Sequence, residues 1–321
     1  MRRILTTAGW AGLFMCFGAI LFGLSTWLML SHSATSRLIW LVAGIGALEA
    51  LIPWSLCFCF GVLPWTLPLK APPPLFSLGD AIGALARAAL IMFTASLLPM
   101  LAPLNLGLFI GLHTGTLKLP NFSSPLALES SFLAGEIAIL LWLSWLMRHL
   151  GPKATDGSPN GVAWRPASLQ GYLGAVMASI GLLALTLLIL TLLPPDSAKL
   201  STMRAARLFS SPAWALAGTF GGILILAPIA EEILFRGLAF AGLAAHWGTG
   251  PAILLSCALF VAVHAPEKLH YWPGFVGVGA LALAACWLRL RYRSIKPGVL
   301  MHILYNAGLL LAGPLLHWSG G

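Results

Sequence analysis

Charged residues are scarce in this sequence of 321 residues: only 8% are Asp, Glu, Lys or Arg, and only nine are acidic. A soluble domain carries about 25% charged residues, so the composition excludes an ordinary water-soluble fold. The chain is 59% hydrophobic and its mean hydropathy is +0.92. These values predict a polytopic membrane protein whose surroundings are a lipid bilayer.

The sequence also lacks the alternating segments of about ten residues that a transmembrane β-barrel needs. Its apolar runs are continuous and reach the roughly 20 residues of a transmembrane helix, which predicts an all-α transmembrane bundle. Eight or nine spans are expected, and residues 104–116 could form a short re-entrant piece. The spans lie near 4–30, 38–62, 81–103, 126–148, 170–193, 211–235, 250–265, 272–290 and 297–318.

Neither a zinc-type cysteine pattern nor a basic cluster is present. The five cysteines lie in apolar segments and are predicted to be buried thiols. The net charge of +9 comes from 18 basic residues scattered through loops and span ends. Nucleic-acid binding requires a clustered basic face, so no nucleic-acid partner is expected. The basic residues instead indicate topology, with the N-terminus in the cytoplasm. The expected location is a bacterial inner membrane.

Ionisable residues within the spans are isolated before residue 211 and form a set after it. Such a group costs roughly 2.5–3.5 kcal/mol at the centre of a span, so the set requires a reason. Residues four apart share one face of a helix, which predicts that Glu232 pairs with Arg236 and that Glu231 remains for other work. The set consists of three motifs: Glu231-Glu232-x-x-x-Arg236, Phe260-x-x-x-His264 and His302-x-x-x-Asn306.

These residue types suit amide hydrolysis. A carboxylate can take a proton from water when burial and a neighbouring carboxylate raise its pKa. Imidazole and carboxamide N–H groups can stabilise the oxyanion that forms. The sequence shows no serine or cysteine beside a histidine in a recognisable nucleophile arrangement, so water is the expected nucleophile.

Glu-Glu-Ile-Leu-Phe-Arg-Gly, Phe-Val-Ala-Val-His and His-Ile-Leu-Tyr-Asn resemble the three motifs of the CPBP family, the CAAX-protease and bacteriocin-processing intramembrane endopeptidases. The resemblance covers roughly residues 211–310. It implies a protease core at 211–318 and N-terminal helices at 1–210 for packing or substrate selection. The implied roles are general base for Glu231, water positioning for His264, oxyanion binding for His302 and Asn306, a supporting ion pair for Glu232 and Arg236, and packing for Phe260.

The resemblance implies a membrane-anchored peptide or protein as substrate, with a prenylated CAAX tail as one form, and no cofactor. One alternative is a zinc-dependent version in which Glu231, His264 and His302 hold the metal. A second is a non-enzymatic scaffold or immunity-type protein that binds a peptide without cutting it. A third is a proton-coupled transporter, which would need ionisable groups along a path across the membrane. The number of copies in the assembly is not specified by the sequence.

Overall fold

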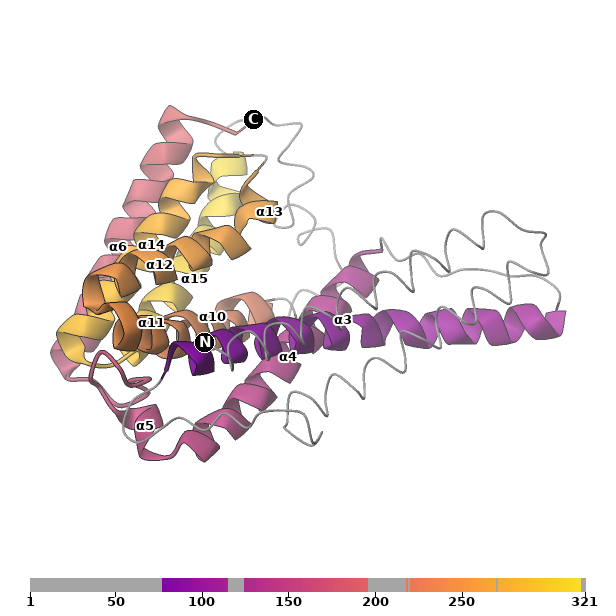
Figure 1. Cartoon of the computed structure of the whole chain (residues 1–321). Coiled ribbons are helices and arrows are strands. Elements are labelled where there is room, and N and C mark those ends of the chain that lie inside the picture. Colours follow the sequence, from indigo (N-terminus) through magenta and orange to yellow (C-terminus); the bar gives the residue numbers. More distant parts are fainter. Residues whose placement is uncertain (1–76, 115–123, 196–217, 219, 270, 319–321) are drawn as a thin grey trace. The chain divides into compact units, whose positions relative to one another are not determined.

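The computed structural model describes residues 77–114, 124–195, 218, 220–269 and 271–318 (Figure 1). Within these ranges every regular element is a helix, which confirms the predicted all-α fold. The predicted spans at 4–30 and 38–62 lie outside the described residues. The chain forms two compact units, one of residues 1–70 and 85–142 and the other of residues 71–84 and 143–321.

Four helices in the described ranges are long and apolar enough to cross a bilayer, so the chain is an integral membrane protein. They are Leu78–Gly107, Ala127–Leu150, Leu169–Leu192 and Gly274–Tyr292. The first two belong to α3 (Leu78–Thr114) and α4 (Pro125–Leu150), and the others are α6 and α14. Because α3 continues to Thr114, the separate piece expected from residue 104 is wrong; Pro99 and Pro103 lie inside the helix without ending it.

The remaining predicted spans all lie in the second unit. The span at 297–318 corresponds to α15 (Lys296–Trp318). The span at 250–265 corresponds to α12 (Thr249–Val263), which has 15 residues and is shorter than the roughly 20 needed for a full crossing. A short helix, α13 (Ala265–Lys268), follows it. In Figure 1, α6, α12, α14 and α15 lie side by side within this unit.

The span predicted at 211–235 does not end where expected. Four segments follow one another in a single helix: η1 (Gly222–Leu226), α10 (Ala227–Glu231), η2 (Glu232–Ala239) and α11 (Phe240–Trp247). The helix ends only at Gly248, whose φ of 81° is open to glycine but strained for other residues. Both η1 and η2 are π-helical, a distortion that is common at functional sites.

The loop at 151–168, which contains the short α5 (Pro152–Thr155), is tied to one end of α14. The Arg289 guanidinium donates to the carbonyl oxygens of Pro159 and Gly161 and lies over the Phe240 ring, with Cζ 4.1 Å from its centroid. The Ile295 N–H donates to the Ala163 carbonyl at 3.0 Å. The sequence predicted only that this segment is a polar loop; its backbone in fact packs against the helices.

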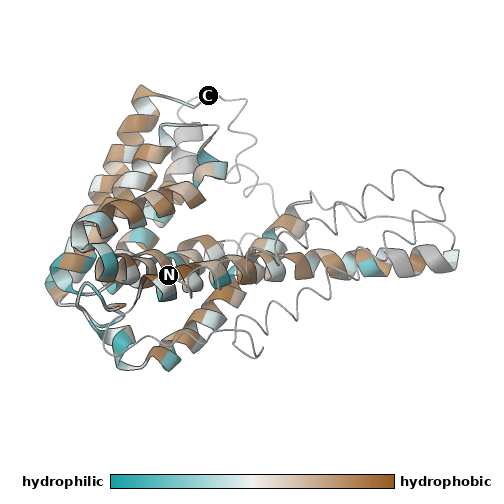
Figure 2. Cartoon of the chain, in the orientation of Figure 1, coloured by the Kyte–Doolittle hydropathy of each residue, from teal (hydrophilic) through white to brown (hydrophobic). Residues whose placement is uncertain are grey.

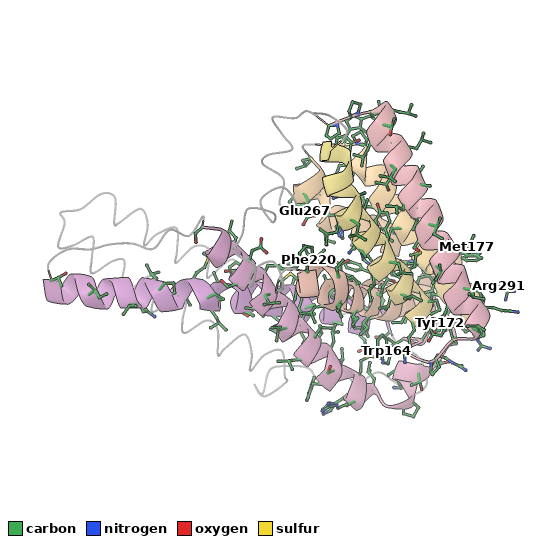
Figure 3. The ribbon with its side chains drawn as sticks, turned by 180° about the vertical axis from the view of Figure 1, so that it is seen from behind. Trp164, Tyr172, Met177, Phe220, Glu267 and Arg291 are labelled. Carbon is green, nitrogen blue, oxygen red and sulfur yellow. The ribbon has the colours of Figure 1, made fainter. Side chains whose placement is uncertain are left out.

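Two ends of the second unit can be distinguished in Figure 3, which places Trp164 and Arg291 at one end and Glu267 at the other. At the first end the Lys296 ammonium lies 5.1 Å from the centroid of the Trp164 ring. In the same loop, the Ser158 N–H and hydroxyl donate to the Asp156 carboxylate and hold its pKa below the usual value. Figure 2 shows hydrophilic residues gathered along this loop and apolar residues along α6.

Candidate active site

Glu231 and Glu232 stand at the junction of α10 and η2. Neighbouring residues on a helix point about 100° apart, and here the two carboxylates have different surroundings. The Glu231 side chain is 24% exposed, whereas that of Glu232 is fully buried. Only Glu231 is therefore open to a water molecule or a substrate.

Glu232 and Arg236 form the predicted ion pair. Arg236 Nη1 lies 3.2 Å from Glu232 Oε1, and both side chains are buried. The two groups do not meet hydrogen-bond geometry, and among the described residues the Arg236 nitrogens donate no hydrogen bond. The guanidinium instead lies over the Phe260 ring, with Cζ 4.1 Å from the centroid, a favourable cation–π position.

Both histidines turn Nε2 toward Glu231. His264 Nδ1–H donates to the Phe260 carbonyl at 2.8 Å, and His302 Nδ1–H donates to Glu232 Oε1 at 3.3 Å. His264 Nε2 then lies 3.9 Å from one Glu231 oxygen, and His302 Nε2 lies 3.8 Å from the other. These separations are too long for direct hydrogen bonds and suit a single bridging water.

Phe260 lies at the centre of this arrangement and is fully buried. Its ring centroid is 4.5 Å from that of His264 and 6.0 Å from that of His302. On another side it meets the Phe235 ring edge-on at 5.3 Å. The aromatic ring thus packs against Arg236 and lies close to both imidazoles.

Asn306 makes a contact that the sequence did not predict. Its Nδ2 donates to the Ile223 carbonyl at 3.1 Å. The Ala227 N–H donates to Gly222 in the π-helical pattern, and Pro228 has no N–H to offer. The Ile223 carbonyl therefore lacks a helical donor, and Asn306 replaces it. The second N–H of the carboxamide remains for another acceptor.

Two glycines for which the sequence indicated no role lie beside the buried pair: Gly237, which follows Arg236 in the first motif, and Gly298. A side chain on Gly298, at the start of α15, would place Cβ 3.2 Å from Glu232 Oε2. A side chain on Gly237 in η2 would place Cβ 2.7 Å from the Val162 side chain. The sequence around Gly298 gives little indication that this glycine lies at the site, because a glycine after a proline usually marks only a turn or a helix start.

Among the described residues, no group of three His, Cys, Asp or Glu side chains has an arrangement that would hold a metal ion. Glu231 faces the two histidines with different oxygens, at 3.9 and 3.8 Å. Tetrahedral zinc with bonds of about 2.0–2.1 Å brings its ligand atoms to about 3.3–3.4 Å from one another. The three predicted ligands would have to move closer to bind zinc.

The fold and site define a helical integral membrane protein with a buried ion pair and two imidazoles directed at a second carboxylate. Residues 211–308 match the family model described as Type II CAAX prenyl endopeptidase Rce1-like, in agreement with the resemblance of the three motifs to the CPBP family of CAAX proteases. The resemblance of the three motifs is thereby confirmed. The matched segment contains every predicted site residue and lies within the predicted core at 211–318; the division of the chain at residue 210 stays a prediction. No curated protein and no solved structure matches the chain.

Proposed function

We propose that the protein is an intramembrane endopeptidase that hydrolyses a peptide bond through a water molecule activated by Glu231. The observation that carries this proposal is the position of the two imidazoles. Each turns its Nε2 atom toward a different oxygen of the same carboxylate, at 3.9 and 3.8 Å. A water at this position would lie within reach of a base, as general-base catalysis requires, and a second polar group would orient it.

In the proposed reaction, Glu231 takes one proton from the water as its oxygen bonds to the peptide carbonyl carbon. His264 has its Nδ1–H bound to the Phe260 carbonyl, so its Nε2 lone pair accepts the other water hydrogen. The proton held by Glu231 then passes to the peptide nitrogen. The C–N bond breaks, and the products are an amine and a carboxylic acid that keeps the other water hydrogen until it ionises.

The oxyanion requires hydrogen-bond donors. When both ring nitrogens of His302 carry protons, Nδ1–H binds Glu232 and Nε2–H is available to the oxyanion. Asn306 contributes the N–H that does not bind the Ile223 carbonyl. The buried Glu232–Arg236 pair positions His302 and does not itself touch the reacting atoms. One such donor is typically worth about 10²–10³ in rate.

The proposed substrate is a membrane-anchored protein or peptide, since the site lies among helices that are apolar enough for a bilayer. The description of the matching family adds a prenylated CAAX tail as the first candidate. The proposed location is a bacterial inner membrane. The alternatives are a zinc-dependent form of the same protease and a scaffold that binds the peptide without cutting it.

The decisive experiment measures cleavage of a prenylated CAAX peptide by the purified protein in liposomes. Glu231→Gln should lower the rate by about 10²–10⁴, the usual contribution of a general base, and leave the unfolding temperature unchanged. Glu267→Gln is the matched control, because this carboxylate lies three residues from His264 and is 59% exposed; it should cleave normally. Normal cleavage by Glu231→Gln would disprove the glutamate mechanism.

The same assay separates the alternatives. A chelator should leave the metal-free enzyme active, whereas the zinc-dependent form would lose activity and regain it when zinc is restored. A scaffold would bind the peptide without cutting it in both the native and the Glu231→Gln forms. Native cleavage together with binding by Glu231→Gln supports the proposed enzyme.

A further inference from the structure

Two free thiols face each other behind the candidate active site. Cys257 lies on α12 and Cys286 on α14, and their Sγ atoms are 3.7 Å apart. Both residues are buried. The Ser256 hydroxyl is 3.5 Å from Cys286 Sγ. A disulfide has an S–S separation of about 2.05 Å, so the two sulfurs have less than 2 Å to close.

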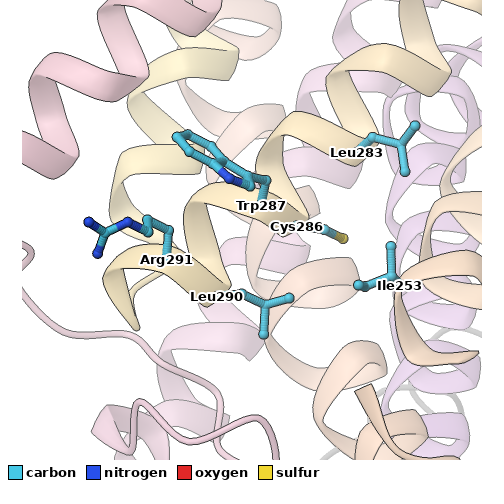
Figure 4. A pocket seen from close by; sticks show the side chains of 6 residues that line it. All are labelled: Ile253, Leu283, Cys286, Trp287, Leu290 and Arg291. Carbon is cyan, nitrogen blue, oxygen red and sulfur yellow. The ribbon is translucent and has the colours of Figure 1, made fainter. Parts of the chain in front are cut away.

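Cys286 lines an open groove and Cys257 does not, although both side chains are buried, at 1% and 8% exposure. Cys286 lies in a groove between α12 and α14 with a volume of about 520 Å³. In Figure 4 its sulfur points toward Ile253 and Leu283. The groove is apolar except for one arginine, and its lining residues are Ile253, Leu283, Cys286, Trp287, Leu290 and Arg291.

The groove is suited to an acyl chain. It follows α14, one of the helices that can span a bilayer, and Leu283 and Trp287 on its sides are about half exposed. Arg291 lies at the basic end of α14, where Arg289 and Arg293 also stand. A guanidinium at the end of an apolar groove complements the phosphate of a phospholipid whose chain lies along the groove.

We propose that Cys286 and Cys257 form a redox modification site that acyl-chain hydroperoxides of the bilayer oxidise to a disulfide. The geometry assigns different roles to the two thiols. Cys286, which borders the groove, meets the oxidant, and Cys257, which does not, resolves the product. Neighbouring attacking and resolving cysteines are typical of redox-sensitive sites. The proposal is independent of the proposed proteolysis, because its readout is the disulfide itself.

The reaction balances in two steps. The Cys286 sulfur bonds to the outer oxygen of the hydroperoxide, the O–O bond breaks, and the thiol proton leaves with the lipid as an alcohol. Cys286 is then a sulfenic acid. The Cys257 sulfur attacks the Cys286 sulfur, the S–O bond breaks, and the hydroxyl group leaves with the Cys257 proton as water. The thiols lose two electrons, which reduce the peroxide.

The test uses the reduced full chain in phosphatidylcholine liposomes with or without phosphatidylcholine hydroperoxide. Peptide mass spectrometry without reductant should show a Cys257–Cys286 linkage that dithiothreitol removes. Hydrogen peroxide at the same concentration should form it at least about tenfold more slowly, because thiol oxidation follows access of the oxidant. Absence of the linkage, or equal rates with the two oxidants, would overturn the proposal.

Variants test the two roles. Cys257→Ser should stop at a sulfenic acid on Cys286, which dimedone labels, whereas Cys286→Ser should leave Cys257 unlabelled. Leu283→Trp, which fills the groove, should slow oxidation by the lipid hydroperoxide. Leu254→Trp is its matched control, because Leu254 is 69% exposed on α12 and does not line the groove. Labelling of Cys257 in Cys286→Ser, or equal rates in the two tryptophan variants, would contradict the assignment.

Discussion

Glu231 and Glu232 are chemically identical neighbours, and burial gives them different environments. The spacing of four residues was sufficient to predict the Glu232–Arg236 pair, which the structure contains at 3.2 Å. The sequence could not indicate that His302, seventy positions away, also bonds Glu232. This long-range contact extends the pair into a network of three residues, whose catalytic role stays a prediction.

Removal of the Glu232 charge should destabilise the protein. Glu232→Gln leaves the Arg236 guanidinium buried without a counter-charge, and breaking such a pair typically costs about 3–5 kcal/mol. The variant should therefore unfold at a lower temperature than the native protein in detergent. Glu231→Gln is the comparison, since the Glu231 side chain is 24% exposed and its loss should affect cleavage much more than stability. Equal unfolding temperatures for Glu232→Gln and the native protein would contradict the structural role of the pair.

At the scale of elements, the positions of helices could be predicted from the length of the continuous apolar runs. The spans predicted at 170–193 and 272–290 agree with Leu169–Leu192 and Gly274–Tyr292 to within two residues at each end. The end predicted at 235 was wrong because a charged residue such as Arg236 usually marks the limit of an apolar span. Here the charge is neutralised inside the bundle, and the helix continues to Trp247.

The π-helical segments were outside the reach of the sequence pattern, which assumes regular α-helical spacing. Their local cause is nevertheless visible at Pro228, which cannot donate a backbone hydrogen bond. The carbonyl of Ile223 is then satisfied by Asn306 from a different helix. A single imino acid thus links the local distortion to the position of a candidate catalytic side chain.

Asn306→Ala should lower stability by up to about 1 kcal/mol, because the partly buried Ile223 carbonyl loses its donor. Pro228→Ala restores an N–H that can reach Ile223 in the π-helical pattern. The loss caused by Asn306→Ala should therefore be smaller in the Pro228→Ala background. A double-mutant cycle of unfolding free energies measures this coupling. Additive effects would show that Asn306 does not replace the missing proline donor.

The close approach of the 151–168 loop to η2 depends on Gly237. Gly237→Ala places Cβ 2.7 Å from the Val162 side chain, and overpacking of this kind typically costs about 1–3 kcal/mol. Val162→Ala in the same chain should recover much of that loss by removing the opposing methyl groups. The free energies of unfolding of the two single variants and the double variant test this. An unaltered Gly237→Ala protein would mean that the loop moves away without cost.

At the scale of the whole molecule, the three motifs predicted which residues lie together. They did not predict the distances between the side chains. Glu231, His264 and His302 come from three separate helical segments, and their mutual distances depend on packing that no local pattern encodes. The packing of the loop at 151–168 was likewise not predictable from its local sequence. Its polar composition predicted exposure, yet Val162 and Ala163 are fully buried, because the buried Arg289 binds the loop backbone from α14.

Lipid is expected to cover α6, where Met177 (Figure 3) and Ile180 are both exposed. Ile180 is 56% exposed near the middle of the helix, and Leu192 is 68% exposed at its end. Ile180→Lys should lower membrane insertion by about 2.5–3.5 kcal/mol, because an ammonium group at mid-span cannot reach water. Leu192→Lys should have a much smaller effect, since a lysine at a helix end extends to the interface. A glycosylation reporter of insertion measures both, and equal insertion of the two variants would show that the centre of α6 does not lie in hydrocarbon.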